Sequence, residues 1–294
     1  MNIKLSKSQQ IFNICNVVFM LILTVIMIYP IWYVICASFS LSEQLIAHTG
    51  LLLTPQGFSL AAYIGVFNNA MIIKGYANTI FIVVIGTLVN IVMTSIAAYC
   101  LSQKNVFWSG LVMRLITITM FVSGGLIPMY LLITRTLHLN NSYLALILPT
   151  AITTYNLIIM RTSFTQVPDS LLESARLDGA SHLQVLFKIV IPLSKSILAV
   201  MVLYYAVAHW NSWFPASIYI KERSKFPLQL ILREILIQND TYSMSQDATA
   251  TDQYSIGESI KYAIIVVATI PILCVYPFLQ RYFTKGVLIG AVKG

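Results

Sequence analysis

The sequence predicts an all-α integral membrane protein, and three features of its composition and patterning support this prediction. Hydrophobic residues make up 58% of the 294 residues and charged residues only 10%, whereas soluble globular domains carry about 25% charged residues. Apolar runs of the length of a membrane-spanning helix recur along the chain. The basic residues, which give a formal net charge of +8, lie mostly in the short gaps between these runs. A nucleic-acid-binding surface gathers its basic residues on one face, so none is expected here.

Six apolar runs are long enough to cross the hydrocarbon core, which needs about 20 residues of helix. They are residues 11–39, 76–101, 111–133, 143–160, 197–220 and 260–283. The first run is too long for the apolar region of a secretory signal peptide, so we interpret it as a retained helix. No tandem repeat interrupts the chain, and we expect one membrane domain over residues 1–294.

The positive-inside rule gives the expected orientation of these spans. With the N-terminus inside, eleven of the 18 Lys and Arg residues fall on the cytoplasmic side and seven outside; five of the seven lie in the long segment 221–261. Long loops are poorly counted by this rule. We therefore expect both termini in the cytoplasm, a cytoplasmic loop at 161–196 and an extracellular loop at 221–259.

The cytoplasmic loop between the fourth and fifth spans carries the clearest local signals. Pro168 ends the preceding helix, because proline disfavours the helical conformation of the residue before it. Two pairs share the spacing of a capping box, which marks a helix start: Ser170 with Glu173, and Ser181 with Gln184. Gly179 predicts a left-handed end to the first helix. The loop should therefore form a short helix, a glycine corner and a second helix that returns to the membrane near Pro192.

The first of these helices has the composition of a docking surface. Its leucines alternate with small residues and with three charged residues, Glu173, Arg176 and Asp178. An exposed apolar stripe on a cytoplasmic helix usually marks an interface. The alternative is a helix lying on the bilayer, but such helices prefer a polar face rich in Lys and Arg. We therefore expect this helix to bind another protein.

This loop resembles a known family. Residues 173–180, Glu-Ser-Ala-Arg-Leu-Asp-Gly-Ala, and the following Phe187-Lys-Ile-Val-Ile-Pro192 are similar to the EAA motif of the membrane subunits of binding-protein-dependent ABC importers. Ser174 stands where alanine is commonest, which exchanges one small residue for another. The resemblance implies the type I importer permease fold and a coupling helix seated on an ATPase subunit. The residues that it assigns to this coupling are Glu173, Ser174, Ala175, Asp178, Gly179 and Ala180.

Four other segments are similar to the carbohydrate branch of the same family, in the position of the second maltose-type permease and its complex-oligosaccharide subgroup. They are residues 78–102, 124–128, 210–215 and 285–294. The resemblance implies a multi-pass protein of the bacterial cytoplasmic membrane, in contact with membrane lipid. The implied partners are a second, homologous permease subunit in a heterodimer, two ATPase subunits, an extracellular solute-binding protein and an oligosaccharide substrate.

The sequence contains no recognisable catalytic or metal-binding constellation. The four histidines lack the spacing of a zinc protease, and the four cysteines lie in apolar runs without metal-ligand spacing. The chain also lacks the P-loop pattern. We therefore expect a non-catalytic transport subunit without a cofactor of its own, whose partner ATPase binds ATP and Mg²⁺.

A sugar path needs aromatic faces and hydrogen-bonding groups rather than fixed charge. No predicted span has an acidic residue in its interior, which disfavours a proton- or sodium-coupled carrier. The polar and aromatic side chains that we expect along the path are Asn78, Tyr130, Tyr155, Asn156, His209, Trp210 and Asn211. Trp210 and Trp213 have the alternative of an interfacial aromatic belt. For Asn90, hydrogen bonding between helices is the favoured interpretation.

The extracellular loop contains an amphipathic stretch at residues 228–237. In the related maltose-type subunit the equivalent loop reaches the binding protein, so the resemblance implies docking through Leu228, Leu232 and Ile235; a solvated linker is the alternative. The tail 286–294 is expected near the ATPase dimer interface. Two other functions stay open from the sequence: an ion-coupled secondary sugar carrier, and a membrane docking scaffold.

Overall fold

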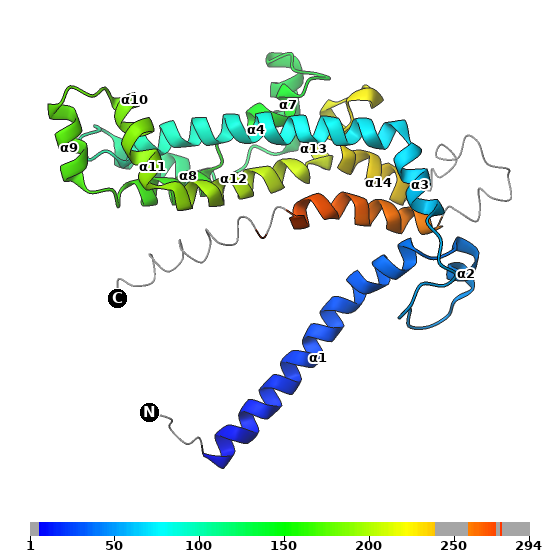
Figure 1. Cartoon of the computed structure of the whole chain (residues 1–294). Helices are drawn as coiled ribbons and strands as arrows, with labels where there is room; N and C mark the ends of the chain where they lie inside the picture. The colour runs from blue at the N-terminus through cyan, green and yellow to red at the C-terminus, as the bar shows by residue number, and fades with distance from the viewer. Residues whose placement is uncertain (1–5, 239–257, 275–276, 278–294) are drawn as a thin grey trace. The chain divides into compact units, whose positions relative to one another are not determined.

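The computed structural model describes residues 6–238, 258–274 and 277, and every regular element in these ranges is a helix (Figure 1). The all-α prediction is confirmed for this part of the chain. The described residues fall into two compact units. The first comprises residues up to 70 together with 234–270, and the second comprises 71–233 together with residues from 271 onward.

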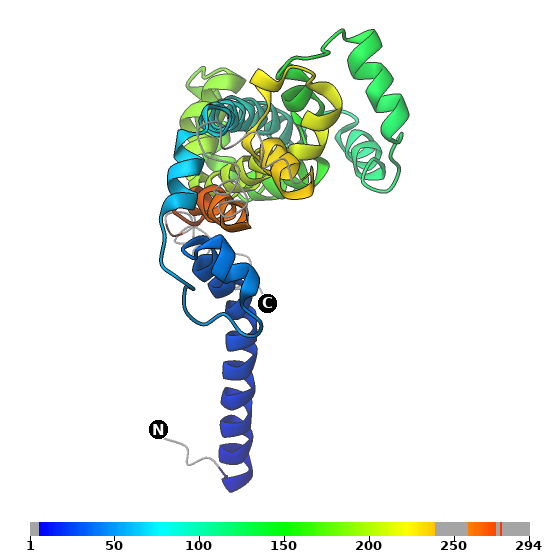
Figure 2. The ribbon, with the colours of Figure 1, turned by 90° about the vertical axis from the view of Figure 1, so that its right-hand side faces the viewer.

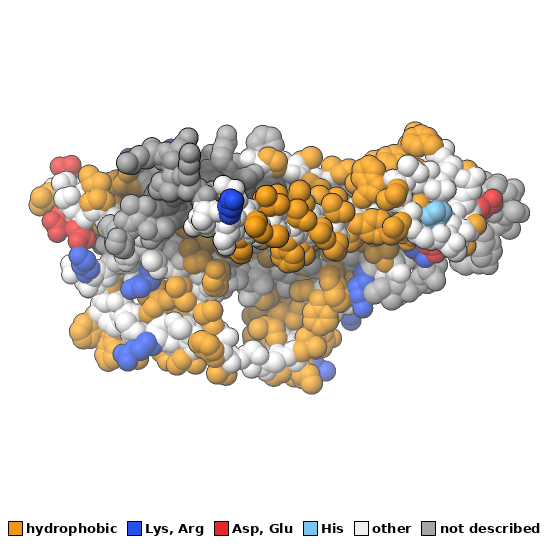
Figure 3. Space-filling model, turned by 90° about the horizontal axis from the view of Figure 1, so that it is seen from below, with side chains coloured by type: hydrophobic (Ala, Val, Ile, Leu, Met, Phe, Trp, Pro, Cys, Tyr) orange, Lys and Arg blue, Asp and Glu red, His pale blue; other side chains and the backbone are white. Residues whose placement is uncertain are grey.

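The first unit is built on the long helix α1 (Lys7–Ser38), which contains the first predicted span. Ser6 and Gln9 form a reciprocal capping box at its start. Its apolar side chains are exposed over most of its length, and hydrophobic side chains dominate the molecular face drawn in Figure 3. Such a surface is unfavourable in water and suits a lipid environment or another subunit.

The end of α1 is fixed by the segments that follow it, α2 (Ser42–Ala47) and α3 (Ala61–Asn68). Cys36 and Ala37 are buried with Leu45 and Leu52 in a small apolar cluster. The Ser42 hydroxyl donates to the Ser259 hydroxyl at 3.0 Å, which joins this turn to the helical residues 258–270 of the same unit. The connection between the first two predicted spans, residues 40–75, therefore contains two short helices.

The second unit is organised along α4 (Ala70–Ser102), an unbroken helix that contains the second predicted span. One face of α4 is buried, and it carries small and polar residues that include Gly86, Asn90 and Thr94. Small residues let helices approach closely in a membrane, and polar residues hydrogen-bond across the contact.

The other elements of the second unit lie around α4, with α9 and α10 at one of its ends and α7 and α13 nearer its middle (Figure 1). In chain order they are α5 (Ser109–Ile118), α6 (Leu126–Leu131), the π-helical turn η1 (Leu132–Thr136), α7 (Leu144–Ile147), the 3-10 turn η2 (Leu148–Thr150), α8 (Thr154–Phe164), α9 (Asp169–Leu177), α10 (His182–Val185), the π-helical turn η3 (Leu186–Val190), α11 (Ile191–Leu193), α12 (Lys195–Trp210), α13 (Trp213–Tyr219), the 3-10 turn η4 (Arg223–Lys225) and α14 (Leu228–Gln238), which the boundary between the units crosses. Neither α5 nor α6 has a buried residue, and Figure 2 shows them beside the other helices of the unit.

Three of the predicted spans are not single straight helices. The run 111–133 is interrupted between α5 and α6, where Gly125 has a φ of +85°. The run 143–160 is divided into residues 144–150 and 154–164, which meet at 51°. The run 197–220 is interrupted between Trp210 and Trp213. The apolar runs were identified correctly as helical, but apolar composition alone did not reveal these breaks.

The number of spans therefore stays a prediction. Among the described helices, α1 and α4 are long and apolar enough to cross a membrane, and four spans result if each of two bent pairs counts as one. The second bent pair is residues 182–193 with 195–210, which meet at 90°. The part of the sixth run up to residue 274 is helical; apart from residue 277, its remainder lies outside the described residues, as does the tail 286–294.

Polar side chains of α4 and α12 form hydrogen bonds with backbone groups at the break in the fourth run. Asn90 donates through Nδ2 to the carbonyl of Thr150, and its Oδ1 accepts a hydrogen bond from His209 Nε2 of α12 at 2.6 Å. One turn further along α4, the hydroxyls of Thr94 and Tyr205 lie 2.7 Å apart, and the Thr153 amide donates to Tyr205 at 3.3 Å. A backbone break within a membrane needs such partners. The predicted role of Asn90 between helices is confirmed.

We predict that Gly86→Ala destabilises the protein by about 1–3 kcal/mol, the usual cost of overpacking. A Cβ at this position would lie 2.5 Å from Nε2 of His209, so the bond between His209 and Asn90 must shift. The thermal stability of the purified protein in detergent measures the effect. Gly110→Ala is the matched control, since its Cβ meets no atom within 4 Å. Equal stability of the two variants would contradict the prediction.

Candidate functional site

Helix α9 begins two residues earlier than the sequence suggests. Pro168 is the N-cap of α9 and Asp169 already belongs to its first turn, without a side-chain capping bond. The predicted capping box of Ser170 with Glu173 is therefore wrong, because Ser170 is inside the helix. The second capping box is confirmed: the Ser181 amide donates to Gln184 Oε1 at 2.8 Å and the Gln184 amide to Ser181 Oγ at 3.4 Å.

The end of α9 is a Schellman motif. The Ala180 amide donates to the carbonyl of Ala175 at 2.9 Å, and the Gly179 amide donates to the carbonyl of Arg176 at 3.0 Å. Gly179 has a φ of +80°, in the left-handed region that glycine adopts without strain. This confirms the predicted glycine corner.

One face of α9 is packed against other helices of the second unit. Leu172 is buried in a cluster with Leu101 at the end of α4 and Phe164 at the end of α8. Ala175 and Ala180, the two residues that close the Schellman motif, are half-buried against the same cluster. Burial of a leucine side chain stabilises such a contact by about 1.5–3 kcal/mol. The helix is thus held on the bundle by apolar packing.

The opposite face of α9 is open. Of the residues that the family resemblance assigns to coupling, Glu173, Ser174, Asp178 and Gly179 are exposed. Leu177 lies among them and is 88% exposed. An apolar side chain beside two carboxylates on an otherwise anchored helix is typical of a surface that contacts another protein.

Two polar contacts join α9 to the turn that follows α4. Lys104 forms an ion pair with Asp169, and Arg176 donates to the side-chain carbonyl of Gln103. The hydrogen bond and charge of Asp169 raise the pKa of Lys104, and the charge of Glu173 acts in the same direction. The ion pair is exposed and adds little to stability, and with the Arg176 bond it joins both ends of α9 to this turn. A cavity of about 340 Å³ lies beside these contacts.

The residues predicted along the sugar path at the end of α12 are mostly buried within the chain. His209 is buried and bound to Asn90, and Trp210 is buried at 8% exposure. Trp210 Nε1 has no hydrogen-bond partner among the described residues. Asn211 is exposed at the end of α12, where its amide donates to the carbonyl of Val207 at 3.0 Å. In this conformation His209 and Trp210 support the packing of α12.

The remaining predicted path residues do not converge on one site. Asn78 donates to the backbone before α14, Tyr130 stacks on Tyr219, and Asn156 is buried. Tyr155 alone among these four is well exposed, at 55%, and its ring centroid lies 6.4 Å from that of Tyr204. The sequence interpretation missed Tyr204, although the Tyr204–Tyr205 doublet within an apolar run was a signal.

The amphipathic helix predicted at 228–237 is confirmed as α14. The three residues assigned to binding-protein docking occupy its buried face: Leu228, Leu232 and Ile235 are each at most 5% exposed. Their apolar side chains pack within the chain, and other residues of α14 are exposed instead. These include Arg233, whose guanidinium lies 4.3 Å from the ring centre of Trp213.

The comparison with known proteins decides the family. Residues 90–289 match the family described as the binding-protein-dependent transport system inner membrane component. The chain belongs to this family. It is 41% identical to Protein LplC of Bacillus subtilis (strain 168) over 289 residues, 98% of this chain and 97% of that protein. It is 42% identical to the polygalacturonan/rhamnogalacturonan transport system permease protein YtcP of the same strain, over 94% of this chain and 96% of that protein.

Solved structures support the same assignment. A chain from a bacterial ABC transporter involved in the import of the acidic polysaccharide alginate matches with a TM-score of 0.87 and 30% identity, over 96% of this chain and 100% of that chain. A chain from the alginate transporter in complex with its pentasaccharide-bound periplasmic protein matches with a TM-score of 0.51 and 15% identity, over 90% of this chain and 94% of that chain, which indicates a shared fold. The resemblance to ABC importer membrane subunits is confirmed.

We predict that Gly179→Ala loosens the α9 corner by about 1–2 kcal/mol, because an L-residue pays a steric penalty in the left-handed region. A Cβ here meets no atom within 4 Å, so the whole effect comes from the backbone. Amide hydrogen exchange at Ala180 should become faster, since its bond to Ala175 weakens. Gly124→Ala, which also has open space but no positive φ, should leave this exchange unchanged; unchanged exchange in Gly179→Ala would contradict the prediction.

Proposed function

We propose that this chain is one of two permease subunits of an ATP-driven importer that carries an oligosaccharide across a bacterial cytoplasmic membrane. The observation that carries the proposal is α9: an anchored helix with an exposed apolar and acidic face, at the position of the EAA motif, in a chain of this transporter family. Six spans and two cytoplasmic termini complete the proposed topology. Sugar uptake is then driven by partner subunits, and this chain transmits their movement.

The proposed partners follow from the exposed surfaces. A second, homologous permease pairs with this chain within the lipid bilayer, and the exposed apolar faces of α5 and α6 are available for such contacts. Two ATPase subunits hold ATP and Mg²⁺ and bind the exposed face of α9. An extracellular binding protein delivers the sugar near α14, through exposed residues such as Arg233.

The mechanism that we propose begins with closure of the ATPase dimer, which moves α9 as a rigid body. The packing of Leu172 passes this movement to α4 and α8. Because α4 is unbroken and is also joined to α9 through Gln103 and Lys104, it carries the movement past the breaks in the fourth and fifth runs. Asn90 then connects α4 to both of these runs.

The substrate class that we infer is an oligosaccharide containing uronic acids. The name of YtcP refers to polygalacturonan and rhamnogalacturonan, and the similar solved transporter imports alginate, which is an acidic polysaccharide. The exposed rings of Tyr155 and Tyr204 offer aromatic faces for a sugar within the membrane part of the chain. Uptake of galacturonate oligomers should exceed that of neutral oligomers of equal length; the reverse order would remove the inference.

Glu173→Ala should lower ATP-driven uptake into membrane vesicles by about tenfold or more, because loss of one partner of an interfacial charge pair costs about 2–5 kcal/mol. Gly179→Pro should also abolish uptake, since proline cannot adopt a φ of +80° and lacks the amide that binds Arg176. Lys195→Ala, at the exposed first residue of α12 and outside the motif, is the control.

The same vesicles separate the alternative functions. Normal uptake in both variants would exclude the proposed coupling. Uptake that persists without ATP and collapses with ionophores would identify an ion-coupled carrier. A chain that co-purifies with no ATPase in fixed stoichiometry would be a docking scaffold.

A charge exchange tests the contact between α9 and α4. Lys104→Glu should lower uptake several-fold, because a carboxylate at position 104 repels both Asp169 and Glu173. A loss of this size lies at the lower end of the range of about 5–150-fold that is typical of coupling between sites. The double variant Lys104→Glu with Asp169→Lys restores the attraction and should recover most of the uptake. A double variant no better than Lys104→Glu alone would show that the ion pair has no role in transmission.

A further inference from the structure

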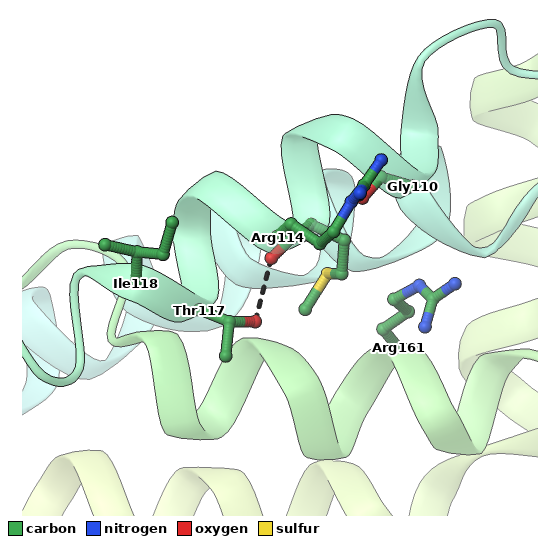
Figure 4. A pocket seen from close by; sticks show the side chains of 6 residues that line it. Gly110, Arg114, Thr117, Ile118 and Arg161 are labelled. Atoms are coloured by element: carbon green, nitrogen blue, oxygen red, sulfur yellow. Dashed lines mark hydrogen bonds between the residues drawn. The ribbon is translucent and has the colours of Figure 1, made fainter.

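A second cavity lies between α5 and α8, with a volume of about 530 Å³ (Figure 4). Its lining residues are Gly110, Met113, Arg114, Thr117, Ile118 and Arg161. Figure 4 shows the guanidinium groups of Arg114 and Arg161 toward the Gly110 end of the cavity, while Ile118 lies at the other end. The lining surface is therefore mostly apolar, with two guanidinium groups at the Gly110 end.

Neither arginine is neutralised within the part of the chain that the structure describes. Arg114 donates through Nε to the carbonyl of Gly110 at 3.3 Å, and Arg161 donates through Nε to the carbonyl of Leu101 at 2.8 Å. Both contacts are with neutral acceptors. Asp169 and Glu173 line the neighbouring cavity, which Arg161 also borders, but Asp169 is already paired with Lys104. Both arginines thus border the α5–α8 cavity without an ion-pair partner among the described residues.

The Ile118 end of the cavity has an apolar lining. The hydroxyl of Thr117 donates to the carbonyl of Met113 on its own helix at 2.8 Å, so it offers no unused donor to the cavity. Met113 and Ile118 supply apolar lining. From Gly110 to Ile118 the helix rises by about 12 Å, at about 1.5 Å per residue. A ligand that fills this space is anionic at one end and apolar along the next 10 Å or so.

The direction of this polarity matches a membrane. In the proposed orientation the turn before α5 is cytoplasmic, so the arginines lie at the inner surface and Ile118 lies deeper. Anionic phospholipids have this arrangement of phosphate and acyl chain, and basic pockets between membrane helices on the cytoplasmic side bind their headgroups. The arginine fork also matches phosphate oxygens in geometry. A soluble phosphate satisfies only the cationic end.

We propose that the cavity between α5 and α8 is a binding site for an anionic phospholipid, whose phosphate lies between Arg114 and Arg161 and whose acyl chain lies along Met113 and Ile118. The site depends on the proposed function only for the orientation of the chain in the membrane. The bound lipid connects α5, which has no buried residue of its own, to α8 of the same unit.

The test measures lipid retention by the purified transporter complex, without ATP or sugar, so that it is independent of uptake. The complex is equilibrated with vesicles of phosphatidylcholine that contain increasing shares of phosphatidylglycerol, and retained lipids are counted by native mass spectrometry. Arg114→Gln should weaken retention of phosphatidylglycerol about fivefold, since one basic residue near a membrane surface contributes about 1 kcal/mol. Arg161→Lys, which keeps the charge and loses the fork, should have a smaller effect.

The control is Arg135→Gln, at an exposed arginine outside the cavity, which should retain phosphatidylglycerol like the parent chain. Equal retention in Arg114→Gln and in the parent chain would overturn the proposal. Displacement of the lipid by inorganic phosphate would identify a soluble anion as the occupant. A cross-link from position 114 to the second permease in the assembled complex would identify a protein carboxylate there instead.

Discussion

The packing of Leu172, Ala175 and Ala180 against the inner ends of α4 and α8 is the constraint on which the second unit depends. It fixes one face of α9, closes the Schellman motif at Gly179 and leaves the other face free. A helix held only by its two chain connections would pivot when a partner pushed it. Because α9 is held by side-chain packing as well, the mechanism that we propose lets a force on its exposed face reach α4 and α8.

Some membrane helices of the second unit are continuous, and others are broken. In the second unit α4 is unbroken, whereas the fourth and fifth runs are interrupted near Thr150 and Asn211. A membrane offers no water to freed backbone groups, so other side chains must bind them. Asn90 and Tyr205 do so here. This explains why the strongly polar residues of these runs are buried, and why the exposed rings of Tyr155 and Tyr204 are the better candidates for contact with a sugar.

Local signals in the sequence predicted part of this structure. The long apolar runs located α1 and α4, and residue spacing located the corner at Gly179 and the second capping box. The start of α9 was misplaced because the Ser170–Glu173 spacing fits a helix that begins two residues later. The polar contacts at the break and at α9 join residues more than 50 positions apart, such as Asn90 with Thr150 and Lys104 with Asp169. No local sequence pattern encodes such pairs, and none shows which face of α14 is buried.

Chemical cross-linking of α9 to the ATPase subunit in the purified complex tests the central claim most directly. Leu177→Cys, in a chain from which the four native cysteines have been removed, places a thiol on the exposed face of α9. The proposed mechanism predicts that a thiol reagent joins this position to the ATPase, with a yield that changes on ATP binding, and that exposed Thr165→Cys, outside α9, gives little product. No cross-link from position 177, or equal yields from both positions, would contradict it.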